Sequence, residues 1–238
     1  MARSKYNNPT TQRWEYADRN PLPTGLDAGD ILVWNNGAWV AKQPSRLPSA
    51  YQEVEWIGSD GTGQYINLEI DVTQNTKVIV EQSFDVPSGT GNFFYFNGTH
   101  NESADNSLIW ACNRENGSTL YRVRAGNTWS IISATVDSNF HTFEIENGSQ
   151  KFDGTQFSTA SLANVGNHIW LFARNSTIPN YSAGKIKSFI LYRGSFPRRY
   201  LVPCYLKYDG SIGLYDLITS NFYGNAGTGT FTKGADVN

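Results

Sequence analysis

The sequence has little charge and no block of charge of one sign. Only 17% of its 238 residues are charged, and the formal net charge is −2. Nucleic-acid-binding domains need clustered lysine and arginine, so this balance argues against a nucleic-acid partner. No apolar run approaches the roughly 18 residues that a membrane-spanning helix needs, so we expect no membrane insertion.

Cysteine and histidine are also scarce, with two cysteines, Cys112 and Cys204, and three histidines. Residues 1–8 lack the apolar stretch of a secretory signal, which predicts synthesis in a cytoplasm. We therefore favour two free thiols over a disulfide, because a cytoplasm keeps thiols reduced. The cysteines and histidines are not spaced as zinc ligands. Oxygen atoms of Asp and Asn in loops suit Ca²⁺, but no run of such ligands defines a site. We expect no metal and no cofactor.

The composition that remains is typical of β-structure. Aromatic residues make up 14% of the chain, and its 22 glycines supply turns between strands. Short strand-like runs recur at near-even spacing without a convincing helix, which predicts an all-β sandwich or jelly roll. The predicted strands are 65–70, 77–84, 92–96, 107–113, 120–125, 129–136, 140–146, 168–174, 185–192 and 201–207.

The first 46 residues differ from the rest. Residues 1–20 are polar and aperiodic and cannot build a core, so they form either a disordered tail or an arm that orders on a larger partner. In residues 21–46, Asn-Gly at 36–37 separates two apolar runs and predicts a β-hairpin, which needs the main domain or sister copies to be stable. The residues predicted to dock or oligomerise are Tyr6, Arg13, Trp14, Tyr16, Trp34 and Trp39.

Both ends of residues 47–238 carry recognisable signatures. Residues 47–57 read Leu-Pro-Ser-Ala-Tyr-Gln-Glu-Val-Glu-Trp-Ile, and Gly-Thr-Gly-Gln-Tyr-Ile follows at 61–66. Residues 213–217 read Gly-Leu-Tyr-Asp-Leu, and a Gly-rich segment closes the domain at 221–231. Together these resemble the ends of concanavalin A-like (LamG-like) domains in structural proteins of bacteriophage and prophage virions. The middle of the domain is similar only in the spacing of its predicted strands.

The resemblance implies a concanavalin A-like jelly-roll sandwich on a short N-terminal arm and hairpin. It also implies a virion protein, a head fibre, decoration protein or tail fibre, made in the cytoplasm of a bacterial host. Residues 1–46 would bind other capsid or tail proteins, the chain would form a homotrimer, and the sandwich would adhere to a cell-surface or mucus glycan. A short chain favours the head fibre or decoration protein. The alternatives are a purely structural stabiliser of capsid or tail, a bacterial surface lectin and a glycoside hydrolase.

Catalysis on this scaffold requires alternating acids on one strand, with a carboxylate pair about 5–5.5 Å apart for a retaining mechanism. The best candidate pair is Glu69 and Asp71, but Thr73 stands where a further acid is needed. We therefore expect no enzyme and assign no catalytic residue.

Sugar recognition favours an aromatic platform beside amide and charged groups. These residue types are densest in the middle of the domain, where Arg122 and Arg124 should share one strand face and grip an acidic glycan. Trp110 and Trp170, in apolar strands, are expected in the core. The predicted glycan-binding residues are Tyr95, Asn97, Asn113, Arg114, Tyr121, Arg122, Arg124 and Trp129.

Overall fold

The computed structural model describes residues 5–8, 13–16, 31–35, 38–42, 46–85, 93–115, 118–177 and 180–237. The chain divides into two compact units, Met1–Arg46 with Asn238, and Leu47–Val237. No helix occurs among the described residues, and so none of them forms a helix that could cross a membrane.

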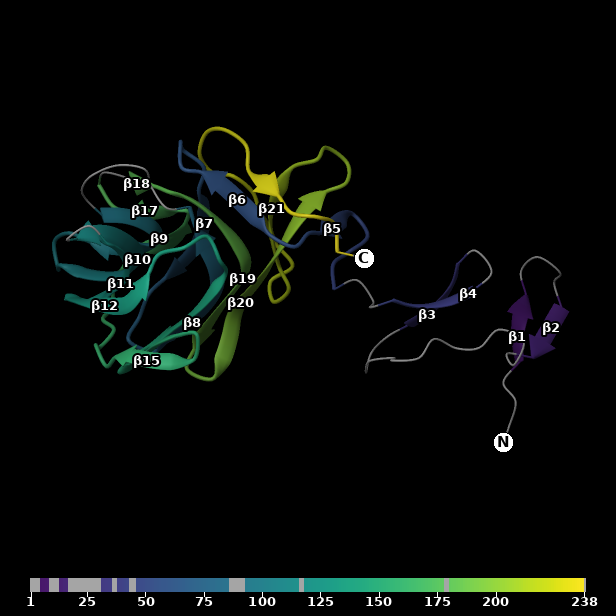
Figure 1. The fold of residues 1–238 in the computed structure, drawn as a ribbon, viewed down its shortest axis with the longest axis horizontal. Coiled ribbons are helices and arrows are strands. Elements are labelled where there is room, and N and C mark those ends of the chain that lie inside the picture. The colour runs from purple at the N-terminus through teal and green to yellow at the C-terminus, as the bar shows by residue number, and fades with distance from the viewer. Residues whose placement is uncertain are drawn as a thin grey trace. The chain divides into compact units, whose positions relative to one another are not determined.

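The first unit contains two antiparallel strand pairs (Figure 1). The predicted hairpin consists of β3 (Ile31–Asn35) and β4 (Ala38–Lys42), and it places Trp34 directly opposite Trp39. A further pair, β1 (Lys5–Asn8) and β2 (Arg13–Tyr16), was not predicted as strands. It contains four of the six residues predicted to dock or oligomerise. The six side chains predicted to dock or oligomerise lie outside those that the structure describes, so their roles stay predictions.

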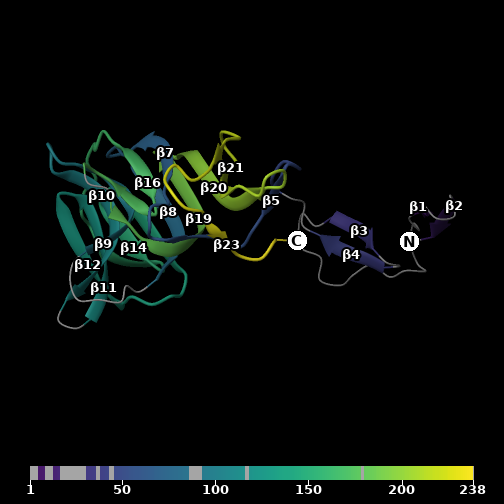
Figure 2. The ribbon, with the colours of Figure 1, turned by 90° about the horizontal axis from the view of Figure 1, so that it is seen from above.

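The second unit is a sandwich of two sheets, seen in two orientations in Figures 1 and 2. Within the described residues the smaller sheet has eight strands, with a main path in the order β12-β11-β10-β9-β16-β7. Its pairings are antiparallel except for a short parallel one between β17 and β9. The strands are β7 (Ile66–Asp71), β9 (Phe93–Asn101), β10 (Asn106–Glu115), β11 (Ser118–Gly126), β12 (Thr128–Thr135), β16 (His168–Leu171), β17 (Ala173–Asn175) and β18 (Asn180–Tyr181).

The larger sheet has eleven strands in the described part of the chain, with a main path β15-β14-β13-β8-β19-β20-β21-β22. The short strands near residues 149–158 were not predicted, because their sequences are mostly polar. The strands are β5 (Tyr51–Glu53), β6 (Ile57–Asp60), β8 (Thr76–Phe84), β13 (His141–Glu146), β14 (Ser149–Phe152), β15 (Thr155–Ser158), β19 (Ala183–Arg193), β20 (Phe196–Leu206), β21 (Ile212–Asp216), β22 (Phe222–Tyr223) and β23 (Thr232–Lys233).

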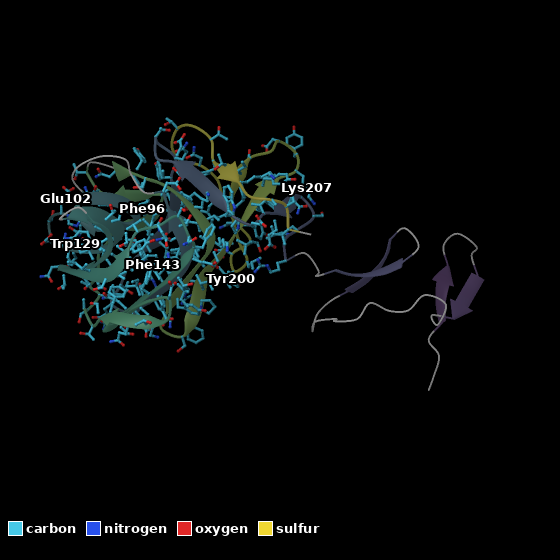
Figure 3. All side chains as sticks on the ribbon, in the orientation of Figure 1. Phe96, Glu102, Trp129, Phe143, Tyr200 and Lys207 are labelled. Carbon is cyan, nitrogen blue, oxygen red and sulfur yellow. The ribbon has the colours of Figure 1, made fainter. Side chains whose placement is uncertain are left out.

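One hydrophobic core lies between the two sheets. It joins Trp110 of the smaller sheet to Phe189 of the larger one, and both side chains are fully buried. Phe84 on β8 packs against Phe96 on β9, and the labelled Phe96 and Phe143 lie in the interior in Figure 3. Burying each such side chain contributes about 1.5–3 kcal/mol. The all-β sandwich predicted from the sequence is therefore confirmed, as is the core position of Trp110.

The two end signatures of the domain meet in space. β23 pairs with β6, and the backbone N–H of Ala226 donates to the carbonyl of Tyr65 at 2.9 Å. In the Gly-rich segment, a Cβ on Gly227 would overlap the backbone carbonyl of Gly63. Residues far apart in the sequence are thus held together by backbone contacts that a larger side chain would block.

His141, at the start of β13, contacts the carboxylates of Asp137 and Asp153. These three residues are called the His141 clamp below. The Nδ1 of His141 lies 2.7 Å from a carboxylate oxygen of Asp153, and its Nε2 lies 2.9 Å from one of Asp137. Burial lowers the pKa of His141, but the hydrogen bonds to the two carboxylates outweigh burial and raise the pKa above its ordinary value. The clamp is therefore strongest when the imidazole is protonated.

Candidate functional site

Two of the predicted glycan-binding residues lie inside the sandwich. Tyr121 is fully buried, its hydroxyl lies 3.2 Å from the backbone nitrogen of Asp137, and burial raises its pKa to about 12. Asn97 is 1% exposed; its side-chain amide donates to Gln82 of the facing sheet, and its carbonyl accepts from the backbone N–H of Phe172 at 2.9 Å. Neither side chain reaches the surface, so their assignment to a ligand-binding surface is corrected.

A β-bulge explains the position of Asn97. The pairing of β9 with β10 shifts register between Trp110 and Ala111, so that Asn97 lies opposite Trp110 and Tyr95 opposite Ala111. Phe96 is the extra residue, and both it and Asn97 are buried. A bulge breaks the strict alternation of faces along a strand, whereas the prediction for Asn97 rested on residue types alone. The side chains of Tyr95, Asn113 and Arg114 lie outside those that the structure describes, and their roles stay predictions.

Arg122 and Arg124 lie on the outer face of the smaller sheet, as their spacing predicted. Their β11 neighbours Tyr121, Val123 and Ala125 are buried in the core, and the two arginines are half-buried on the other side. Side chains alternate between the faces of a strand, so this arrangement follows directly from the sequence. We call the outer side of the smaller sheet around these two residues the arginine face.

Trp129, on β12, stands directly opposite Arg124 in the antiparallel register. The guanidinium carbon of Arg124 lies 5.8 Å from the centre of the Trp129 ring, within the range of a cation–π contact. Arg124 also pairs with Asp105, with 2.7 Å between Nη2 and Oδ1. Two partners therefore fix this guanidinium beside the indole, and Figure 3 shows Trp129 at the periphery of the domain.

His100 and a further arginine, Arg174, belong to the same region as Arg124. Burial lowers the pKa of His100, and the positive charges of Arg124 and Arg174 lower it further. His100 is therefore neutral at pH 7, and its Nδ1 lies 2.6 Å from the hydroxyl of Ser107. Two guanidinium groups and a neutral imidazole therefore lie together here, beside the carboxylates of Asp105 and Glu102.

Trp170 was expected in the core but lies on the outer face. Its neighbours Ile169 and Leu171 are buried in the core, so Trp170 points to the other side of β16 and is half-buried. Its ring stacks on Tyr65, with 4.2 Å between ring centres, and Tyr181 lies 6.1 Å from Tyr65. The alternation in residues 168–171 would have revealed this position.

The register joins the two tryptophans in one row across the sheet. Trp170 is level with Gly98, Gly98 with Ile109, Ile109 with Arg124, and Arg124 with Trp129. The row takes four inter-strand steps of ~4.8 Å, so its ends are about 19 Å apart. Aromatic rings stand at both ends and a glycine lies between them. Gly98 and Ile109, between the two rings, are buried, so the groups that a ligand can reach lie toward the two ends of the row.

The acidic pair considered for catalysis lies elsewhere on the domain. Glu69 and Asp71 line a hollow of about 470 Å³ with His168 and three arginines, and they are the only carboxylates among the described residues that line it. Glu69 has a left-handed backbone conformation, with φ of 51°. Across the described chain, no group of three or more His, Cys, Asp or Glu side chains is placed to hold a metal ion.

No protein family and no curated protein matches the chain. Among solved structures, the enzymatically active domain of bacteriophage CBA120 tailspike protein 2 matches 60% of this chain and 28% of its own length, with a TM-score of 0.39 and 10% identity. The full-length tailspike protein 2 from an Escherichia coli O157:H7 bacteriophage matches 61% of this chain and 26% of its own length, with a TM-score of 0.37 and 9% identity. Similarity this low carries no conclusion about fold or function.

Proposed function

We propose that this chain is a non-catalytic phage virion protein, a head fibre, decoration protein or short tail fibre, that displays a glycan-binding sandwich. The sandwich would be a concanavalin A-like jelly roll, and the ligand an acidic oligosaccharide of the host surface or of mucus. The observation that carries the binding role is the row on the arginine face that runs from Trp129 and Arg124 to Trp170. The virion role rests on the resemblance of the two end signatures.

The chemistry of the row supports this ligand class. Sugar rings present apolar C–H faces that stack on indole and phenol rings, and Trp129 and the Tyr65–Trp170 pair offer such rings at both ends. Between and beside them, Arg122 and Arg124 provide planar guanidinium donors for carboxylates. Aromatic and guanidinium groups held in fixed positions lower the entropy cost of binding.

A glycan array with matched variants tests the binding role. We expect the wild type to bind acidic oligosaccharides, and Trp129→Ala or Arg122→Ala to lose at least about tenfold in affinity, since one lost stacking or guanidinium contact costs roughly 1.4 kcal/mol or more. Lys187→Ala is the matched control, because Lys187 is a half-exposed cation of the larger sheet whose partner is Glu81 at 3.2 Å. Equal losses in all three variants, or no change in any, would contradict the proposal.

The attachment role is tested on phage particles. Residues 1–46 belong to one compact unit and the sandwich forms the other. A chain that begins at Leu47 should therefore still fold and bind glycans. We expect this truncation to lose incorporation into virions and to convert a trimer into a monomer in sedimentation. Unchanged incorporation together with a monomeric full-length protein would refute the attachment and trimer proposals.

The alternatives give different outcomes in the same experiments. A purely structural stabiliser would bind nothing on the array, yet its deletion would reduce virion stability. A glycoside hydrolase would release product from a bound oligosaccharide, and turnover that disappears in Glu69→Gln or Asp71→Asn would replace the non-catalytic proposal.

A further inference from the structure

A second hollow adjoins the one that contains Glu69 and Asp71. It measures about 540 Å³ and shares Arg193 with the first hollow, which measures about 470 Å³. Both hollows lie where the end of β7 and the segment after it, residues 69–75, meet the turn between β19 and β20, residues 193–199. His168 also lines the first hollow and Asn164 the second. We call the two together the end groove. It contains none of the arginine-face residues Arg122, Arg124 and Trp129.

Phe196 lines the second hollow with a ring that is 70% exposed. A single exposed aromatic residue is common on protein surfaces and indicates little by itself. Here it is surrounded by polar groups, because Gln74, Asn75 and Asn164 line the same hollow. The side chains of Gln74 and Asn75 make no hydrogen bond within the described chain. An aromatic platform beside available amides is the arrangement that sugar rings need.

The first hollow is lined by three arginines and two carboxylates. Arg193 is fixed by a 3.0 Å hydrogen bond from Nη2 to the carbonyl of Asp71, and Arg199 by bonds to the carbonyls of Leu68 and Arg198. Arg198 itself is exposed, and its guanidinium has no ion pair or hydrogen bond in the part of the chain that the structure describes. Arg199 also lies 3.7 Å from the buried carboxylate of Asp216. Arg198, which is exposed, is available to an incoming anion.

We propose that the end groove is a second saccharide-binding site, in which Phe196 stacks on a sugar ring and Arg198, beside Arg193, binds the carboxylate of an acidic sugar. The proposal rests on the proposed function, because it assigns a further site for the same class of ligand. Asp71 and His168, 3.5 Å apart, and Glu69 also line the first hollow and would supply acceptors and donors for hydroxyl groups. Two separated sites on one domain would let it bind a glycan-rich surface with avidity.

Two matched pairs of variants of the full-length chain test the end groove. Phe196→Ala is compared with Tyr208→Ala, which removes an aromatic ring that is 94% exposed on another turn. Arg198→Ala is compared with Lys207→Ala, which removes an exposed cation from that turn. The probe is an array of acidic and neutral oligosaccharides, followed by hydrogen-exchange mass spectrometry with the strongest acidic binder.

We expect Phe196→Ala and Arg198→Ala to weaken binding of acidic oligosaccharides by about tenfold, the loss of one stacking or charge-assisted contact. The two control variants should bind like the wild type, and the ligand should protect residues 193–199 from exchange. If Phe196→Ala binds with wild-type affinity and the ligand protects only residues 119–131, the proposal for the end groove is overturned. The proposal for the arginine face would then stand. Loss in Phe196→Ala but not in Arg198→Ala overturns the assignment to acidic sugars, and a wild type that binds no glycan overturns both sites.

Discussion

Replacing Asn97 with alanine separates a structural role from a binding role. Asn97 connects the sheets, because its amide donates to Gln82 on β8 and its carbonyl accepts from the backbone N–H of Phe172. All three residues are at most 2% exposed. The substitution therefore removes both partners at once from groups that water cannot easily reach.

The expected loss of stability follows from these two groups. A buried polar group left without its partner costs about 1–3 kcal/mol, so two of them give about 2–6 kcal/mol. For a domain of this size, each kcal/mol lowers the melting temperature by about 2–4 °C. We expect a decrease of about 4–24 °C, with the lower values if a water molecule enters the space that the amide leaves.

The assay is thermal unfolding of the full-length chain, followed by glycan affinity of the folded variant well below its melting temperature. Asn127→Ala is the matched control, because Asn127 is exposed in the turn before β12 and bonds only to its neighbour Thr128. Its melting temperature should stay within about 2 °C of the wild type, as is usual for surface substitutions. Unchanged stability of Asn97→Ala, or a loss of affinity without a loss of stability, would refute the structural role.

Three further predictions concern other parts of the sandwich. The raised pKa of His141 means that the His141 clamp stabilises the fold fully below the unfolded pKa of about 6.5 and loses this contribution as the pH rises through the folded pKa. The urea midpoint should fall over that window in the wild type but not in His141→Gln, and a level wild-type curve would contradict the sign. Cys112 and Cys204 are free and buried, and burial raises the pKa of each thiol to about 12. Neither should react with iodoacetamide until the chain is denatured, and rapid labelling of the native protein, read by mass spectrometry, would count against this burial. Gly227→Ala should cost about 1–3 kcal/mol through overlap with the backbone, whereas Gly224→Ala, whose Cβ meets only a Phe222 ring carbon at 3.4 Å, should melt near the wild type.

The sequence predicted features that depend on local pattern. Alternation of side chains placed Arg122 and Arg124 on one face of β11, and Asn-Gly at 36–37 marked the hairpin of β3 and β4. Turn residues at near-even spacing between short strand-like runs were enough to predict a sandwich without helices. These features are decided by the two-residue period of a strand and by the few residues that form tight turns.

Other features depended on contacts between distant segments. Alternation defines two faces of a strand but not which of them packs against another sheet, so Tyr121 and Arg122 were equal candidates for the surface until the core was known. The bulge at Phe96 turned Asn97 inward through a pairing with β10 that the sequence of β9 alone does not encode.

The two candidate binding regions show the same division. The sequence by itself determined that arginines, tryptophans and amides were available on strands and turns. Only the tertiary structure decided that Trp170 joins Trp129 in one row, and that Phe196 and Arg193 meet Gln74 and Asn164 across a gap of many residues. The physical reason is that a binding surface is made of side chains brought together by sheet order and register, and these are set by the packing of the whole core rather than by any local segment.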